Sequence, residues 1–178
     1  WGWAGGRGRG ARGCTVEENG VRTSHASAGP TSVYVGLGRG NDFVTPGATP
    51  ILPAGMGLPP TSQPICTAGT NIANSVAVLA AFGAQHILVP NLSDLGKTAS
   101  AVAAGPAYQA GATALTIGFN NALGAALAGV YTLFPGSVMP FDTFSLCNQI
   151  LADAWSYGVC GTTQSCLTGG GAHGAATS

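Results

Sequence analysis

The sequence carries very little charge. Only 7% of its 178 residues are Asp, Glu, Lys or Arg, against about 25% in typical soluble domains. The formal net charge is zero, so nothing suggests a nucleic-acid partner or an anionic membrane surface. Long apolar runs are missing too, since none approaches the ~20 residues that a bilayer span requires. We therefore expect one domain with no nucleic-acid partner and no membrane span.

Metal-binding patterns are also absent. There is no Cys-x-x-Cys pair, and the three histidines (His25, His86 and His173) lie far apart in the sequence. We therefore expect no metal and no cofactor. Cys160 and Cys166 flank a short loop that a disulfide could close, and with the low charge this favours an oxidising, extracytoplasmic compartment. Reduced thiols in a cytosolic protein are the alternative.

The first 30 residues differ in composition from the rest. They are rich in Gly, Arg and Ala, and Val16 and Val21 are their only branched aliphatic residues. No buried strand is predicted there, so we expect a low-complexity, irregular segment. The chain starts at Trp1 without a signal peptide, which indicates either a removed leader or a piece of a longer chain.

From residue 31 onward the apolar periodicity predicts alternating strands and helices. This alternation is typical of βαβ units, so we expect an α/β fold with a parallel sheet covered on both faces. The run from His86 to Pro90 is continuously apolar, which predicts burial on both of its faces. The predicted strands cover 32–37, 86–90 and 130–134, and the predicted helices cover 68–83, 107–129 and 143–154.

The longest predicted helix, 107–129, is apolar enough to raise the question of a membrane segment. Leucines and one phenylalanine recur on one stripe, but four polar residues interrupt the remaining surface. This pattern favours an amphipathic helix that covers the sheet. The four polar residues of this helix are Gln109, Thr113, Asn120 and Asn121. The next predicted helix, 143–154, can be capped by Asp142 or Thr143.

Polar side chains follow two of the predicted strands. The segment TSVYVGLGRGNDF passes from an apolar run through glycines to Asn41 and Asp42. Open α/β sheets place their sites at the carboxyl ends of strands, and an amide held there can stabilise an oxyanion. The alternative is a turn-forming Asn-Asp pair, which is the role we assign to Asp42. Asn91 and Asp94 follow the second strand, where cleft lining and Asx-turn chemistry explain them equally well.

Three segments, taken together and in this order, resemble the GDSL-type, or SGNH, serine esterases and lipases of the bacterial secreted and autotransporter branch. YVGLGRGNDF resembles the strand that ends in Gly-x-Asn-Asp. GAQHILVPNLSDLGKTA is similar to that branch's Ile-Val-Pro-Asn-Leu-Pro-Asp-Leu-Gly stretch. The third segment resembles the part of that branch that contains Tyr-Gly-Phe and a Cys; it reads FDTFSLCNQILADAWSYGVCGTTQSCL. The resemblance covers residues 31–167.

The resemblance implies serine acyl transfer on carboxylic esters. Asn41 matches the family's oxyanion Asn, and Gly20 is the candidate for its second oxyanion donor. Gly40 and Asn91 fall at the implied substrate cleft. Arg39 stands where the family has the Gly of Gly-x-Asn-Asp, which puts the approach to the carbonyl oxygen in doubt.

The family's nucleophile and base motifs are missing. No Gly-Asp-Ser and no Asp-x-x-His occurs in the sequence. Ser24 and Ser27 follow no strand, and His25 beside them is expected in a surface loop. His173 is the remaining candidate base, although residue 170 is Gly where the family has its Asp. The serine and the base would then come from residues absent here or from unorthodox substitutes, as in a chain truncated at both ends.

Two functions are therefore open. The first is a secreted carboxylic ester hydrolase that acts on a small ester or lipid. The second is a non-catalytic α/β remnant or binding module that lacks the attacking group. The implied fold is a three-layer α/β/α sandwich, flavodoxin-like and incomplete. It comprises an irregular segment at 1–30, the α/β domain at 31–167 and a flexible tail at 168–178, with open sheet edges that could support self-association.

Overall fold

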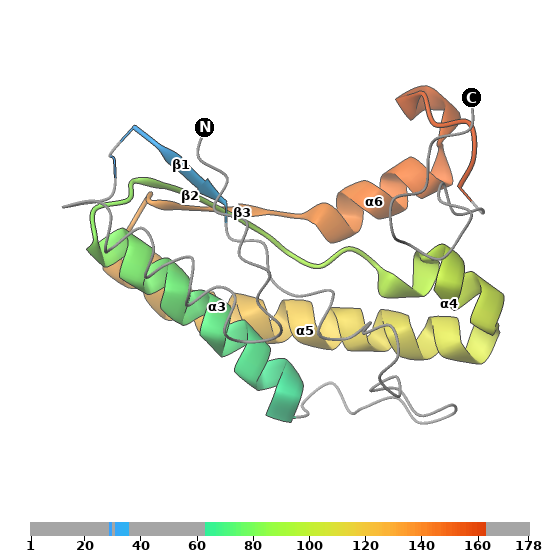
Figure 1. Ribbon diagram of the computed structural model, residues 1–178, viewed down its shortest axis with the longest axis horizontal. Helices are drawn as coiled ribbons and strands as arrows, with labels where there is room; N and C mark the ends of the chain where they lie inside the picture. The colour runs from blue at the N-terminus through green and yellow to red at the C-terminus, as the bar shows by residue number, and fades with distance from the viewer. Residues whose placement is uncertain (1–28, 30, 36–62, 163–178) are drawn as a thin grey trace, which may run out of the picture.

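The computed structural model describes residues 29, 31–35 and 63–162. Within them the protein is a mixed helix-and-strand structure with a parallel three-stranded sheet of order β1-β2-β3. Two long helices lie together along one side of that sheet (Figure 1). The strands are β1 (Val33–Val35), β2 (His86–Pro90) and β3 (Val138–Phe141); the long helices are α3 (Gln63–Ala81) and α5 (Pro106–Leu133); the shorter elements are η1 (Leu95–Lys97), α4 (Ala99–Ala104), α6 (Thr143–Ala152) and η2 (Trp155–Tyr157).

The strand order explains why α3 and α5 share one face. Connections between parallel strands are almost always right-handed. When the strands follow one another in space in the same order as in sequence, every right-handed crossover passes over the same face. Helices α3 and α5 pack against each other on that face, so the helices of both described crossovers cover one side of the sheet.

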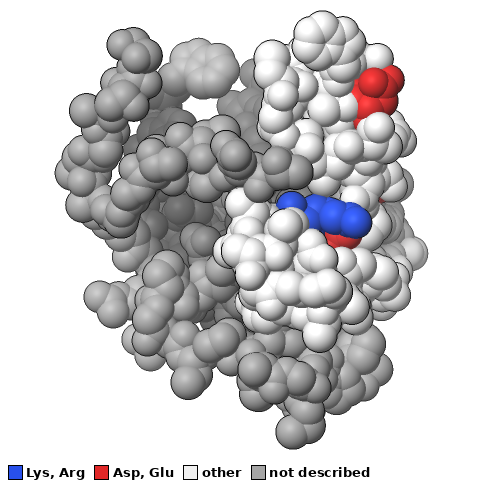
Figure 2. All heavy atoms as spheres, turned by 90° about the vertical axis from the view of Figure 1, so that its right-hand side faces the viewer, with Lys and Arg blue, Asp and Glu red and all other residues white. Residues whose placement is uncertain are grey.

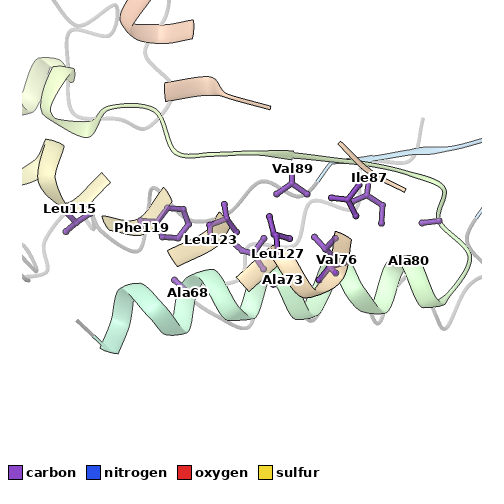
Figure 3. Close-up of a cluster of buried hydrophobic side chains, with 14 of the residues drawn as sticks. Ala68, Ala73, Val76, Ala80, Ile87, Val89, Leu115, Phe119, Leu123 and Leu127 are labelled. Carbon is purple, nitrogen blue, oxygen red and sulfur yellow. The ribbon is translucent and has the colours of Figure 1, made fainter. Parts of the chain in front are cut away.

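The core lies between the sheet and the helix pair (Figure 3). Tyr34, Ile87 and Val138 occupy one row of the parallel register, and Ile87 is fully buried. A stripe of side chains on α5 packs against this row in the core. The stripe consists of Leu115, Phe119, Leu123, Leu127 and Val130, all buried.

The opposite face of the sheet is apolar but open in the described part of the chain. The row Val35, Leu88 and Met139 lies on it, and Val35 is 53% exposed. Leu88 is only half-buried and His86 is exposed. The prediction that 86–90 is buried on both faces is therefore wrong. The strand is buried through Ile87 and Val89 alone, because both described crossover helices lie on one side.

Helix α3 approaches α5 closely because of a glycine. A Cβ added to Gly69 would lie 3.1 Å from the backbone nitrogen of Leu123, so the two helices meet nearly backbone to backbone. The helix predicted over 68–83 is confirmed, although it begins at Gln63 and ends at Ala81. Gly83, with φ of 104°, follows the end of the helix, a conformation that glycine adopts without strain.

The third strand is not where the sequence pattern placed it. Residues 130–133 form the last turn of α5, and Val130 continues its buried stripe at the helical spacing from Leu127. The chain then turns at Gly136, with φ of 80°, and β3 follows at 138–141. Pro140 is tolerated there because β3 is an edge of the described sheet.

By length and hydropathy alone, α5 could cross a membrane. In the structure its apolar stripe instead packs against α3 and the sheet. The predicted role as an amphipathic helix over the sheet is confirmed, and the helix is longer than expected at 28 residues.

Two predicted regions lie largely outside the described residues. The irregular segment predicted at 1–30 is described only at Gly29, and the tail predicted at 168–178 is not described. The strand predicted over 32–37 is confirmed in its middle, at Val33–Val35.

Candidate functional site

The carboxyl ends of β1, β2 and β3 define one edge of the sheet, which we call the carboxyl edge. Because the three strands are parallel, the chain leaves each of them on this same side. Asn91 follows β2 directly and Asp142 follows β3. Of the predicted site residues, Asn91 alone is described. The others, namely Gly20, Gly40, Asn41 and His173, lie outside the described residues.

Asn91 uses both ends of its amide to hold the next element. Its Nδ2 donates to Oδ1 of Asp142 at 2.8 Å, and its Oδ1 accepts the backbone N–H of Phe144 at 2.9 Å. Its own backbone N–H donates to the carbonyl of Phe141 at 3.0 Å. The predicted cleft residue therefore joins β2 to the start of α6 through both ends of its amide.

Asp142 is the N-terminal cap of α6, as the sequence predicted. Its Oδ1 accepts the backbone N–H of Ser145 at 3.1 Å. Hydrogen bonds from Ser145 and from Asn91 hold the pKa of the exposed Asp142 carboxyl below its ordinary value. The carboxylate is thus the form that the surrounding donors favour, and Asp142 is unsuited to act as a general acid.

A single side chain of α5 fixes the chain just after Asn91. Asn120 accepts the Leu92 N–H on Oδ1 at 2.8 Å and donates from Nδ2 to the Leu92 carbonyl at 2.9 Å. One turn earlier, Oγ1 of Thr116 accepts the Leu95 N–H at 3.2 Å and donates to the Ala112 carbonyl at 2.9 Å. Thr116 is fully buried, so these bonds satisfy groups that have no access to water.

Asp94 is buried and accepts one local hydrogen bond and one from α5. Its Oδ1 accepts the Gly96 N–H at 2.9 Å and the Thr113 hydroxyl at 2.7 Å. It caps η1 in the manner of an Asx turn. Of the two roles open for Asp94 from sequence, the turn role is confirmed.

Gly96 brings this loop into direct contact with α5. A Cβ at this position would overlap Oγ1 of Thr113 and the carbonyl oxygen of Gln109. The loop 91–98 is therefore a rigid part of the carboxyl edge, held by a polar stripe on an otherwise apolar helix. From the sequence, Thr113 and Asn120 indicate only that α5 is not a membrane segment. Their spacing with Thr116, at positions i, i+3 and i+7, was the signal that could have identified the stripe.

No histidine side chain lies at the carboxyl edge within the described residues. His86 is exposed at the first residue of β2, and hence at the opposite edge of the sheet. This confirms its predicted place at the entrance of the strand. Among the described residues no group of three His, Cys, Asp or Glu side chains could hold a metal ion.

Two cysteines near the C-terminal end of the described residues are free thiols. Cys147 lies half-buried on α6, and Cys160 is exposed. Cys166 lies outside the described residues, so the possible Cys160–Cys166 disulfide stays a prediction.

The described surface is almost without charge. Its charged side chains are Lys97, Asp142 and Asp153, while Asp94 is buried, and Figure 2 shows how sparse charged groups are on one face of the molecule. The described part of the chain therefore offers few charges that could attract a charged ligand.

No protein-family model matches the chain, and no curated protein matches it.

Proposed function

We propose that the chain carries the sheet and the oxyanion-binding edge of a GDSL-type carboxylic ester hydrolase. The substrate class is a small ester or lipid, and the reaction is acyl transfer to a serine followed by hydrolysis. No cofactor takes part. The complete architecture we propose is a three-layer α/β/α sandwich over residues 31–167, in a protein that acts outside the cytoplasm.

One observation carries the proposal. β1 pairs in parallel with β2, with Val35 opposite Leu88. The chain that leaves β1 toward Asn41 therefore starts from the carboxyl edge, beside the rigid loop 91–98. The oxyanion role requires the scaffold to hold the amide donor in a fixed position, because only a preorganised donor stabilises the developing charge. A rigid neighbouring loop at this edge supports that role for Asn41.

The proposed roles differ in their support. Asn41 would donate its side-chain amide to the carbonyl oxygen as negative charge develops, and Gly20 would add a backbone N–H. Gly40 would let the substrate approach the backbone. Asn91, whose amide is occupied by Asp142 and Phe144, is a positioning residue in this scheme.

Hydrolysis of p-nitrophenyl butyrate tests the proposal. The chain is expected to release p-nitrophenolate faster than buffer, and Asn41→Ala is expected to lower kcat about 10²-fold because one oxyanion donor is lost. Asn121→Ala is the matched control, since Asn121 is exposed on α5. Equal rates for the chain and for buffer would reject the proposal.

The second candidate is a binding module without catalysis. Two observations favour it: the sequence has no Gly-Asp-Ser or Asp-x-x-His, and His86 lies at the edge opposite the proposed site. This candidate predicts that butyrate shifts NMR signals at the carboxyl edge while p-nitrophenyl butyrate remains uncleaved. Turnover that depends on Asn41 would reject it.

Self-association through the sheet is the partner interaction we propose. β1 and β3 are the two edges of the sheet in the described residues, and unpaired edges can pair with another chain. Light scattering over a range of protein concentrations is expected to show a mass that rises with concentration. A constant monomer mass would rule this interaction out.

A further inference from the structure

Helix α6 is attached to the molecule differently from the two long helices, α3 and α5. None of its ten residues is buried, although Phe144, Cys147, Ile150 and Leu151 are half-buried. Within the described residues the extensive contacts between elements involve α3, α4, α5, η1 and the strands, but not α6. Figure 1 shows α6 beyond the end of β3, away from α3.

Two connections hold the start of α6 in place. One is the chain itself, which passes from Phe141 of β3 through Asp142 into the helix. The other is the amide of Asn91, which bonds both Asp142 and the N–H of Phe144. Both bonds of Asn91 fall on the first turn of α6, so they fix its position and its direction with respect to β2.

We propose that α6 opens and closes as a unit at the carboxyl edge of the sheet, with the Asn91 amide as its latch. Opening breaks the two Asn91 bonds and turns the helix about the junction between Phe141 and Asp142. The α3–α5 core is not disturbed, because no buried side chain of that core belongs to α6. Such a segment opens at a lower free energy than the whole domain unfolds.

The latch gives the carboxyl edge a movable side. Loop 91–98 is fixed to α5 by Asn120, Thr116 and Thr113, whereas α6 is fixed to that loop by Asn91. A ligand at the carboxyl edge would therefore have a rigid wall on the side of β2 and an adjustable one beyond β3. The opening itself requires neither a ligand nor the proposed ester hydrolysis.

Amide hydrogen exchange of the full chain, without ligand, tests the proposal. The amides of 146–152 are expected to exchange faster than the buried central amides of α5. In Asn91→Ala the α6 amides are expected to exchange about tenfold faster still, since the latch bonds are gone. The α5 amides are expected to keep their rates.

Two further variants separate the latch from a general loss of stability. Asn121→Ala makes the same chemical change at an exposed position of α5 and is expected to leave α6 exchange unchanged. Asn91→Asp places a carboxylate against Asp142 and is expected to speed α6 exchange at neutral pH. Adding Asp142→Asn to Asn91→Asp restores a donor for the new carboxylate, and exchange is expected to return toward the wild-type rate.

Three results would overturn the proposal. The first is α6 exchange at the same rate as the core of α5. The second is an equal acceleration of α5 and α6 in Asn91→Ala, which would mean global destabilisation. The third is exchange in the double variant that stays as fast as in Asn91→Asp alone. Because no substrate is present, these results are independent of whether the chain hydrolyses esters.

Discussion

The helix pair α3–α5 and the single helix α6 are joined to the same sheet by different interactions. α3 and α5 contribute most of the buried side chains of the core and meet backbone to backbone at Gly69. α6 contributes no buried residue and is positioned by hydrogen bonds at its first turn. Apolar burial is non-directional and adds up over area, whereas the α6 attachment depends on the geometry of a few polar atoms.

Loop 91–98 lies between these two regions and shares features of both. It is packed against α5 at Gly96, like a part of the core. It is also held by polar side chains, Asn120 and Thr116 above all. Polar residues on an apolar helix can therefore hold a loop in place, and the rigidity of the carboxyl edge originates in α5.

The largest effect is expected from truncating the centre of the core. Phe119 is 1% exposed, so Phe119→Ala removes a buried ring and leaves a cavity. We expect a loss of roughly 3–5 kcal/mol in the free energy of unfolding, measured by urea denaturation. Trp155→Ala is the matched control, because Trp155 is 82% exposed beyond α6, and a change within about 0.5 kcal/mol is expected. Similar losses for both variants would remove the contrast between the regions.

A smaller effect is expected from adding one methyl group to the loop. In Gly96→Ala the Cβ would overlap the Gln109 carbonyl, a backbone atom that cannot rotate away. We expect a loss of roughly 1–3 kcal/mol from this overpacking, with shifted NMR signals for residues 94–98. Gly124→Ala is the control, since nothing lies within 4 Å of its added Cβ, and it is expected to stabilise α5 by up to about 1 kcal/mol. If Gly96→Ala is as stable as the wild type, the loop is not held against α5.

The smallest effect is expected from the charge at the start of α6. The pKa of Asp142 is lowered from 3.8 by hydrogen bonds from Ser145 and Asn91. The contribution of the ionised Asp142 carboxylate to the free energy of unfolding is therefore fully present above about pH 4 to 5. It is lost as the pH falls through the lowered pKa. Because the group is exposed, the effect is small and screened by salt. The wild type is expected to gain stability over Asp142→Asn as the pH rises from 2 to 5, in thermal melts at low salt. A difference that is constant over that range would contradict this assignment.

Much of the fold could be predicted from periodicity. The stripe of Leu115, Phe119, Leu123 and Leu127 identified α5, and His86–Pro90 was found at its observed bounds. Short apolar runs were less informative, because the run from Val130 to Phe134 fits a strand as well as a helix end. In the structure Val130 is buried in the core as part of α5, which favours the helix over a strand at 130–133. β3 was obscured by Pro140, a residue that is tolerated at the edge of the described sheet.

The site could be predicted less well than the fold. Sequence position placed Asn91 correctly after β2, but its role depends on where α6 begins in space, and no local pattern contains that information. The role of Asp142 was easier to predict, because a capping residue is defined by the helix that it precedes. The predicted oxyanion residue Asn41 lies outside the described residues, so its role stays a prediction.

The most direct test of the hydrolase proposal is labelling of the full chain with a fluorophosphonate, with the modified residue located by mass spectrometry. An ester hydrolase that uses serine acyl transfer is expected to carry the label on one serine, and Asn41→Ala is expected to label more slowly. Labelling of Ser24 or Ser27 would keep the reaction but reject the alignment that places Asn41 at the oxyanion. A folded chain with no labelled serine would contradict the hydrolase proposal and favour the binding module.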